Sequence, residues 1–202
     1  TGIIGSSPDI VWVTTSPGAY SSIYGQALQG GVQAAWSGSF VAWNFGTLAP
    51  DSPIRDAIQR DWVWGYPISP WSADTPGSAK GRELIQGYDP DAPPYEYYLE
   101  GVVEAWLLEA ILNAAYESGD MTRAGVIAAA KSLESMSWDG LAPDQQFAGD
   151  ANDTVQRVVN IVRPSAADLE AGGSGLELLE ANYTSDTAAG YTFTAACFDA
   201  GF

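Results

Sequence analysis

The sequence predicts an α/β protein with a largely parallel sheet flanked by helices. Three β-rich segments alternate with helical patterns over residues 1–68, and this order is typical of βαβ units. Further along, residues 94–117 carry one long apolar helical repeat, which needs a surface to pack on because isolated helices are marginal in water. The chain has 202 residues, 46% of them hydrophobic, so it can bury a sizeable core.

The first βα unit starts with residues 10–15 (IVWVTT), a nearly continuous apolar run. Such a run is typical of a strand covered on both faces, as in a parallel sheet. A Ser-Pro-Gly turn follows, and apolar residues then recur at helical spacing over residues 19–35. We therefore expect a buried strand followed by a helix that crosses back over the sheet.

The second unit repeats this order with shorter elements. Residues 39–43 (SFVAW) predict a strand, and residues 62–68 (WVWGYPI) predict a third. Between them, Asp51 or Ser52 can cap a short helix that starts at Pro53, because Asp and Ser are favoured caps and Pro suits the first turn.

The next segment, residues 69–78 (SPWSADTPGS), is rich in Pro, Ser and Gly and predicts a hinge or linker. The long apolar repeat after it begins near Pro94 and ends before Gly119, and we expect its stripe to pack on the upstream strands. Helical spacing predicts helices over residues 75–87, 94–117 and 122–133.

The last third of the sequence is less regular. Residues 155–162 (VQRVVNIV) return to strand character, and the leucines of residues 176–179 predict a helical turn. Residues 188–202 form a terminal segment rich in aromatic residues and alanine.

Composition excludes several classes of function. The chain has 25 acidic and 8 basic residues, a formal net charge of −17, which argues against nucleic acid or anionic membrane partners because both need a basic surface. It has no histidine, so a Ser-His-Asp or Cys-His nucleophile pair is excluded. Cys197 is the single cysteine, so no internal disulfide can form, and without a basic neighbour it reads as a small buried hydrophobe.

Polar and aromatic residues follow each of the three predicted strands. In open α/β sheets, ligands bind beyond the carboxyl ends of the strands. Hydroxyls, an amide and aromatic rings together suit a small polar molecule. The candidate ligand-binding residues are Thr15, Ser16, Tyr20, Trp43, Asn44 and Trp71; packing and helix capping are the alternative roles for each of them.

The abundant acids leave two further interpretations open. Paired carboxylates such as Glu100 and Glu104 are what a glycosidase needs, although acids this frequent also pair by chance. The acidic residues of 139–154 include enough oxygen ligands for calcium, but their spacing is not that of an EF-hand, which favours a solvated turn. We expect no metal centre and no cofactor.

Several short segments occur in a familiar order. Residues 8–13 (PDIVWV) are followed by 23–28 (IYGQAL), by Trp-Ser-Gly at 36–38, and by 95–106 (YEYYLEGVVEAW) and 138–141 (WDGL). This order resembles the C-terminal half of the type I periplasmic-binding-protein-like substrate-binding proteins of ABC transporters. Within that family it is most similar to the branched-chain amino acid (Leu/Ile/Val) receptors.

The resemblance implies a two-lobed fold whose first half is missing here. It places residues 1–68 in the second lobe, 69–78 in a crossing, 79–150 as helices of the first lobe, 151–164 as a return strand, and 165–202 as a C-terminal tail segment. It also implies a periplasmic or extracellular protein, anchored to the membrane through an N-terminal region, with a membrane permease as partner.

The resemblance implies a non-enzymatic role in which the lobes close over a ligand. Family ligand positions fall on Thr15, Ser16 and residues 42–44. Amino-acid receptors of the family usually place a carboxylate in the second of these loops, and residues 41–44 (VAWN) have none. The expected ligand is an amino acid, an amide or a sugar-like compound, and Trp43 and Asn44 favour an amide, a sugar-like or an aromatic compound over an amino acid. The alternatives are a carbohydrate-active hydrolase that uses paired carboxylates, and a ligand sensor of the same fold without transport.

Overall fold

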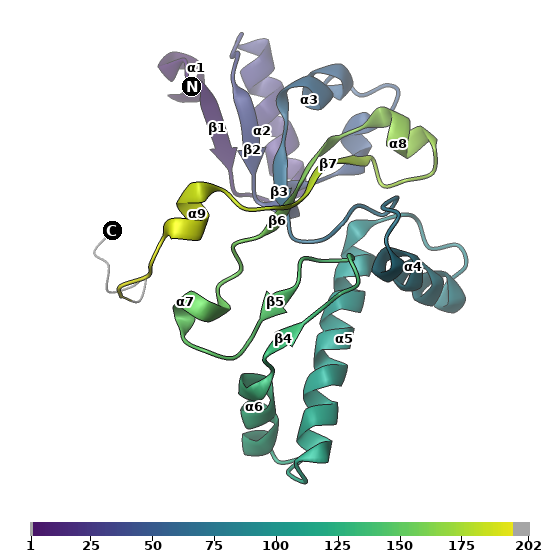
Figure 1. Cartoon of the computed structure of the whole chain (residues 1–202). Helices are drawn as coiled ribbons and strands as arrows, with labels where there is room; N and C mark the ends of the chain where they lie inside the picture. The colour runs from purple at the N-terminus through teal and green to yellow at the C-terminus, as the bar shows by residue number, and fades with distance from the viewer. Residues whose placement is uncertain (1, 196–202) are drawn as a thin grey trace.

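The computed structural model describes residues 2–195 as a mixed α/β structure (Figure 1). Its strands are β1 (Ile10–Val13), β2 (Ala35–Gly38), β3 (Trp64–Tyr66), β4 (Ser135–Met136), β5 (Gln145–Gln146), β6 (Val159–Pro164) and β7 (Leu176–Tyr183). Its helices are α1 (Gly2–Ser6), α2 (Pro17–Gln29), α3 (Arg55–Asp61), α4 (Pro76–Tyr88), α5 (Glu96–Glu117), α6 (Arg123–Ser132), α7 (Ala151–Thr154), α8 (Ala166–Glu170) and α9 (Asp186–Gly190), with 3₁₀ turns η1 (Phe40–Ala42) and η2 (Phe45–Leu48).

The strands confirm the α/β class but run in mixed directions. Strand β1 pairs with β2 in parallel, from Ile10 opposite Ala35 to Val13 opposite Gly38. A parallel bridge between Trp36 and Trp62 carries the pairing toward β3. Strands β3, β6 and β7 then pair antiparallel. We call β1, β2, β3, β6 and β7 with α2, α3 and α8 the sheet region (Figure 1).

Aromatic side chains form the core of the sheet region. The indoles of Trp36, Trp62 and Trp64 are fully buried. The ring centroid of Trp62 lies 5.6 Å from that of Trp36 and 4.9 Å from that of Trp64. Tyr20 and Tyr24 of α2 pack edge-on against Trp62. Large aromatic side chains bury much apolar area each, so this cluster explains why the short strands hold together.

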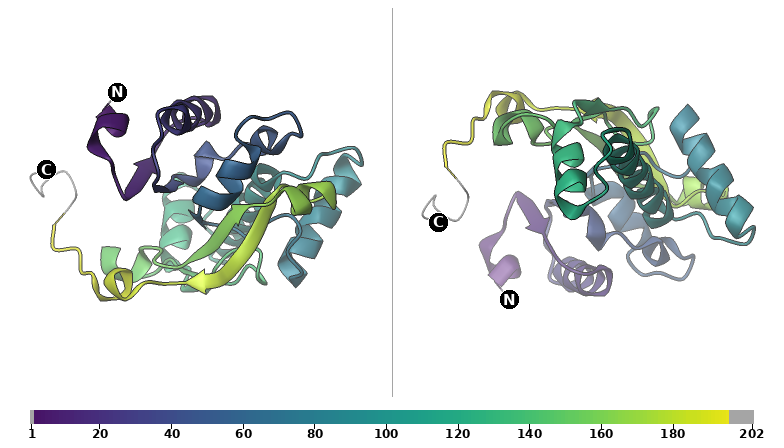
Figure 2. Two further views of the ribbon diagram at one scale, coloured as in Figure 1. Left: turned by 90° about the horizontal axis from the view of Figure 1, so that it is seen from above. Right: turned by 90° about the horizontal axis from the view of Figure 1, so that it is seen from below.

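The long helix α5 forms, as predicted, but its partners are other helices. It packs against α6 and α4 rather than on the upstream strands, and the view from below shows α6, α5 and α4 side by side (Figure 2). We call α4, α5, α6, β4 and β5 the helical region. Leu108, Leu112 and Tyr116 remain exposed on α5, so its apolar surface exceeds what these neighbours cover.

The prediction of a strand at residues 39–43 is wrong, because β2 ends at Gly38. Pairing with β1 ends at Gly38, where a Cβ would lie 2.1 Å from the Val13 carbonyl oxygen, and Phe40–Ala42 turns into η1. Only glycine fits this close approach. The apolar run that suggested a strand instead packs as a turn, with Ala42 and Trp43 fully buried.

Three smaller expectations also differ from the structure. Leu176–Tyr183 is strand β7, not a helical turn, because it pairs along β6. Helix α3 begins after Ile54, without a side-chain cap from Asp51 or Ser52. Strand β1 is covered on one face only, since Ile10 and Trp12 are about two-thirds exposed.

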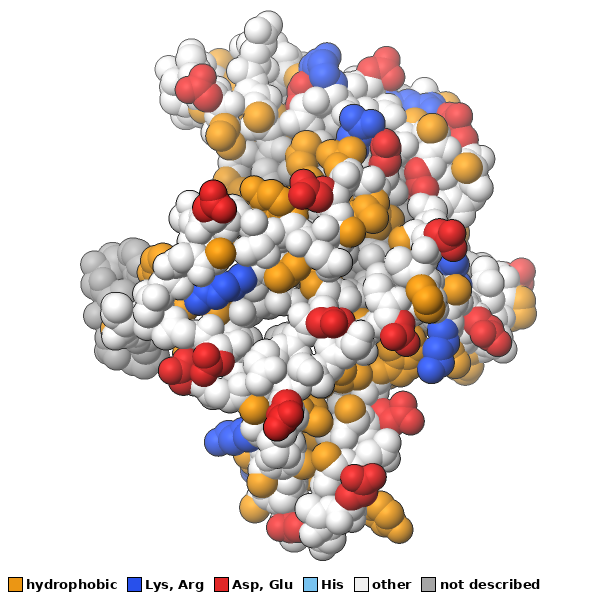
Figure 3. All heavy atoms as spheres, viewed as in Figure 1, with side chains coloured by type: hydrophobic (Ala, Val, Ile, Leu, Met, Phe, Trp, Pro, Cys, Tyr) orange, Lys and Arg blue, Asp and Glu red, His pale blue; other side chains and the backbone are white. Residues whose placement is uncertain are grey.

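Acidic side chains are scattered over the surface seen in Figure 3, with few basic ones between them. Within residues 2–195, no helix has the length and apolar character needed to cross a membrane. No group of three or more candidate side chains in that part of the chain is arranged to hold a metal ion. Cys197 and the end of the predicted terminal segment lie outside the described residues.

Candidate functional site

The carboxyl end of β1 places two of the candidate residues at the edge of the sheet region. Thr15 is half-buried and Ser16 is exposed. Ser16 is the N-cap residue of α2, but its hydroxyl makes no capping hydrogen bond. A hydroxyl beside the positive end of a helix is suited to meet an acceptor group of a ligand.

Tyr20 and Trp43 lie inside the core instead of at a surface. Both side chains are fully buried, and the Trp43 ring meets Trp64 edge-on at 5.4 Å. Burial raises the pKa of Tyr20 to about 12. Among the described residues, neither the Tyr20 hydroxyl nor the Trp43 indole nitrogen has a hydrogen-bond partner. These two residues therefore support the loops from behind.

Asn44 is held in a defined orientation by the turn it starts. Its side-chain oxygen accepts a hydrogen bond of 2.9 Å from the Gly46 backbone nitrogen, and its backbone carbonyl accepts one of 2.8 Å from the Thr47 hydroxyl. The capping bond occupies the oxygen and leaves the side-chain NH₂ group as a donor.

Trp71 lies in the segment that leads from β3 to α4. Its side chain is buried, its backbone nitrogen donates to the Glu96 carboxylate at 3.3 Å, and its carbonyl accepts from the Arg82 guanidinium. The predicted hinge at residues 69–78 is thus fixed to both α4 and α5.

Aromatic residues that the sequence interpretation missed lie where the sheet and helical regions meet. Phe45, at the start of η2, contacts Tyr95 edge-on at 5.6 Å, and Tyr95 contacts Tyr97 at 4.8 Å. Phe45 is 40% exposed. The tyrosines at 95, 97 and 98, at the start of α5, are the signal that could have indicated them, since Tyr combines apolar area with a polar tip.

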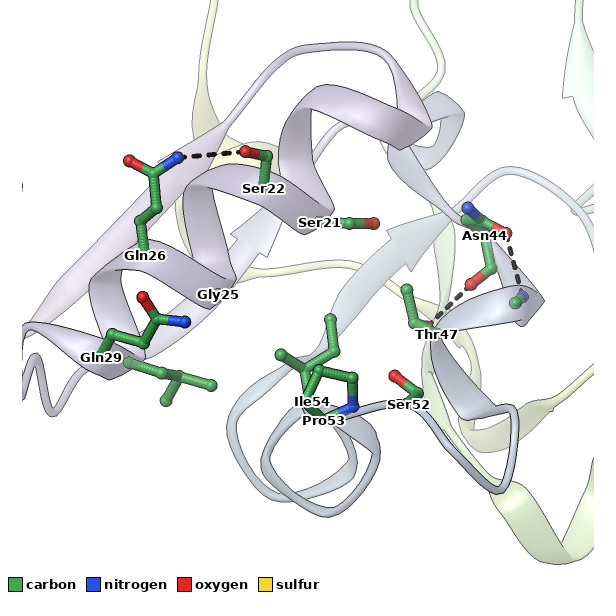
Figure 4. Close-up of a pocket in the computed structure, with 12 residues that line it drawn as sticks. Ser21, Ser22, Gly25, Gln26, Gln29, Asn44, Thr47, Ser52, Pro53 and Ile54 are labelled. Carbon is green, nitrogen blue, oxygen red and sulfur yellow. Dashed lines mark hydrogen bonds between the residues drawn. The ribbon is translucent and has the colours of Figure 1, made fainter.

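A cavity of about 630 Å³ opens between α2 and η2, next to Asn44. Figure 4 shows Ser21 pointing from α2 toward the side where Asn44 and Thr47 lie. Every residue that lines it is uncharged, and its hydroxyls and carboxamides come from Ser21, Ser22, Gln26, Gln29, Asn44, Thr47 and Ser52. Such a lining suits a neutral ligand with several hydrogen-bonding groups.

Two acidic residues of the segment 139–154 cap a short helix. Asp150 accepts from the backbone nitrogens of Asn152 and Asp153, and Asp153 accepts from Asp150 in return. This capping box uses the carboxylates that the calcium interpretation relied on. Of the suspected acid pair on α5, Glu100 has its pKa raised, first by burial and then by Glu104.

No protein-family model matches the chain, and the search of curated proteins found no match. The solved structures are informative: the fold is that of the substrate-binding proteins of ABC transporters. A fatty acid ABC transporter substrate-binding protein from Thermomonospora curvata matches with a TM-score of 0.81 and 24% identity, over 94% of this chain and 47% of that one.

Two other similar structures are named for the binding or transport of branched-chain amino acids. A possible leucine/isoleucine/valine-binding protein from Rhodopirellula baltica SH 1 matches with a TM-score of 0.61 and 21% identity, over 85% of this chain and 42% of that one. A branched-chain amino acid ABC transporter from Thermus thermophilus with bound valine matches with a TM-score of 0.56 and 17% identity, over 88% and 47%. The chain therefore spans about half the length of the proteins it resembles.

Proposed function

We propose that this chain is part of the extracytoplasmic solute-binding component of an ABC importer. The observation that carries the proposal is the structural similarity over 94% of the chain to one such protein. A membrane permease is the partner that this function requires, with the protein outside the cytoplasm and anchored to the membrane.

We assign the two lobes as the sequence predicted, except that α8 and β7, expected in the C-terminal tail segment, are placed with β6 in the sheet region. The sheet region would belong to the second lobe, and the helices of residues 79–150 to the first, joined by the crossing at 69–78. The exposed apolar side chains of Leu108, Leu112 and Tyr116 support this assignment, because a surface of that kind is normally covered in a stable protein. Closure of the lobes over a ligand would present the closed form to the permease.

The ligand we propose is a small uncharged molecule with amide or sugar-like hydrogen-bonding groups. Asn44 would contact it from the cavity, and Thr15 and Ser16, which do not line the cavity, would contact it from the loop after β1. Tyr20 and Trp43 would support these loops from behind, and Trp71 would hold the crossing segment. Two of the similar proteins are named for a fatty acid and for bound valine, and both of these ligands carry a carboxylate. The cavity beside Asn44 offers no Lys or Arg to pair with one, which favours the neutral class.

Calorimetric titration of the native-length protein with amides, sugars and amino acids tests the proposal. We expect saturable binding of one neutral class. Asn44→Asp keeps the cap, because Asp also accepts from the Gly46 nitrogen, but it replaces the donor NH₂ with a charge. We expect it to weaken binding at least tenfold, or about 1.4 kcal/mol.

Asn113→Asp is the matched control, since Asn113 is exposed on α5 and should leave binding unchanged. If Asn44→Asp binds as tightly as wild type, Asn44 does not contact the ligand, but the proposed function still holds. A folded native-length protein that binds none of these compounds would overturn the proposed function.

A further inference from the structure

A buried carboxylate connects three separate segments at the junction of the sheet and helical regions. Glu96 is the first residue of α5, and its side chain is 1% exposed. Its Oε1 accepts from the Trp71 backbone nitrogen and from the Ser174 hydroxyl. Trp71 lies between β3 and α4, and Ser174 between α8 and β7, so one oxygen ties the crossing segment and a turn of the sheet region to α5.

The second oxygen of Glu96 is the unusual one. Oε2 is buried and has no hydrogen-bond partner among the described residues. A buried carboxylate oxygen that carries charge without a partner is costly. The neutral acid avoids this cost, because the proton can sit on Oε2 while Oε1 continues to accept from both donors.

The surroundings of Glu96 add negative rather than positive charge. Burial is the main reason why the pKa of Glu96 rises to about 7; the hydrogen bonds from Ser174 and Trp71 oppose the rise, and the charge of Asp168 on α8 adds a smaller one. Burial first, and the charge of Glu96 as a further cause, raise the pKa values of Tyr66 on β3, of Tyr95 just before α5 and of Tyr97 on α5.

Neither of the two cations on α4 is paired with Glu96: Lys80 lies over the Trp106 ring, 5.0 Å from its centroid. The Arg82 guanidinium donates to the carbonyl oxygens of Trp71 and Ala73, and it therefore holds the crossing segment rather than the carboxylate.

We propose that Glu96 is a proton-dependent tie between the two regions of the chain. With a proton on Oε2, the crossing segment and the Ser174 turn stay fastened to the first turn of α5. When the proton leaves, the uncompensated charge favours entry of water and loosening of these contacts. This inference goes beyond the proposed function, because the tie acts whether or not a ligand binds.

The test compares hydrogen exchange of backbone amides in the native-length protein at pH 5.5 and 8.5, corrected for intrinsic rates. We expect protection at Trp71 and in the turn around Ser174 to fall at least fivefold at the higher pH. Glu96→Gln is uncharged at both pH values and should remove this pH dependence. Glu100→Gln, one turn further along α5 and half-buried, is the matched control and should keep it.

The carboxyl carbon of Glu96 provides a second readout that needs no variant to fold. Its NMR shift should titrate near neutral pH in the wild-type protein. Titration in the ordinary range near 4.5 would overturn the proposal, and so would equal pH dependence in wild type and Glu96→Gln. Neither measurement uses a ligand, so both can still be interpreted if the solute-binding proposal fails.

Discussion

The Tyr24 hydroxyl donates a hydrogen bond of 2.7 Å to Asp61 Oδ2 and so joins α2 to the end of α3. Tyr24 is fully buried, and Asp61 also pairs with Arg60. Since hydrogen bonds to charged groups contribute about 1.5–3 kcal/mol, we expect Tyr24→Phe to lower the free energy of unfolding by that amount. Urea denaturation followed by circular dichroism measures it.

Tyr20→Phe is the matched control for this prediction. Tyr20 lies one turn earlier on the same helix, is equally buried and packs on the same indole, that of Trp62. Its hydroxyl makes no well-formed hydrogen bond among the described residues, although the nearby Thr47 and Ser21 hydroxyls lower its pKa. Its removal should therefore cost at most about 1 kcal/mol, less than the loss of the Asp61 bond. Equal losses in the two variants would contradict the assigned role of the Asp61 bond.

The contact between Phe45 and Tyr95 should be measurable as a coupling energy. Their rings lie edge-on at 5.6 Å between η2 and the start of α5. Aromatic pairs in this geometry typically contribute about 0.5–1.5 kcal/mol beyond their buried area. A double-mutant cycle of Phe45→Ala and Tyr95→Ala in urea should return this coupling, and a value near zero would show that the rings do not interact in solution.

Two glycines of α4 should respond oppositely to the same substitution. A Cβ at Gly77 would lie 2.0 Å from the Trp138 carbonyl oxygen, whereas one at Gly87 would meet nothing within 4 Å. We expect Gly77→Ala to destabilise the protein by about 1–3 kcal/mol through overpacking. Gly87→Ala should stabilise it by about 0.5–1 kcal/mol, since alanine suits a helix better; the melting temperatures of the pair give the signs.

The exposed apolar face of α5 gives a test of the two-lobe assignment. Leu108 is 54% exposed in this chain, but the proposal has it covered in the native-length protein. There, Leu108→Asp should cost more than about 2 kcal/mol, because a charge would be buried without a partner. Glu83→Ala, at an exposed position of α4, should stay within about 0.5 kcal/mol. A small effect of Leu108→Asp would mean that this face remains in water.

The pH dependence of stability follows from Glu96. The folded protein holds its proton up to about pH 7, whereas an unperturbed carboxyl releases it near 4.5. Between these values the folded state binds more protons, so the free energy of unfolding falls as pH rises. Wild type should therefore melt at a lower temperature at pH 8 than at pH 5.5, and Glu96→Gln should flatten this trend.

Local patterns predicted the helices better than the strands. Helices α4, α5 and α6 follow the predicted residues closely, because capping residues and apolar periodicity depend only on residues within a few turns of one another. Strands β2 and β7 depend on distant partners, β1 and β6. The approach of Gly38 to Val13 is of this kind, and no local pattern indicates it.

The candidate site shows the same division. The loops after β1 and β2 were predicted to carry polar groups, and Ser16 and Asn44 are found at those loops. That Trp43 faces inward depends on Trp64, which no spacing around residue 43 encodes. Glu96 was assigned no role from the sequence, since burial of an acid at a helix start is set by Trp71 and Ser174.

The tryptophan cluster also has a spectroscopic consequence. Successive contacts join Trp36, Trp62, Trp64 and Trp43, with centroids 4.9–5.6 Å apart. Indoles fixed this closely in a packed core give a strong near-ultraviolet circular dichroism signal. Four of the eight tryptophans lie in this cluster, so the near-ultraviolet signal is weighted to the sheet region, whereas the far-ultraviolet signal is weighted to helices such as α5. Melting followed in both ranges would therefore reveal whether the two regions unfold together or one after the other.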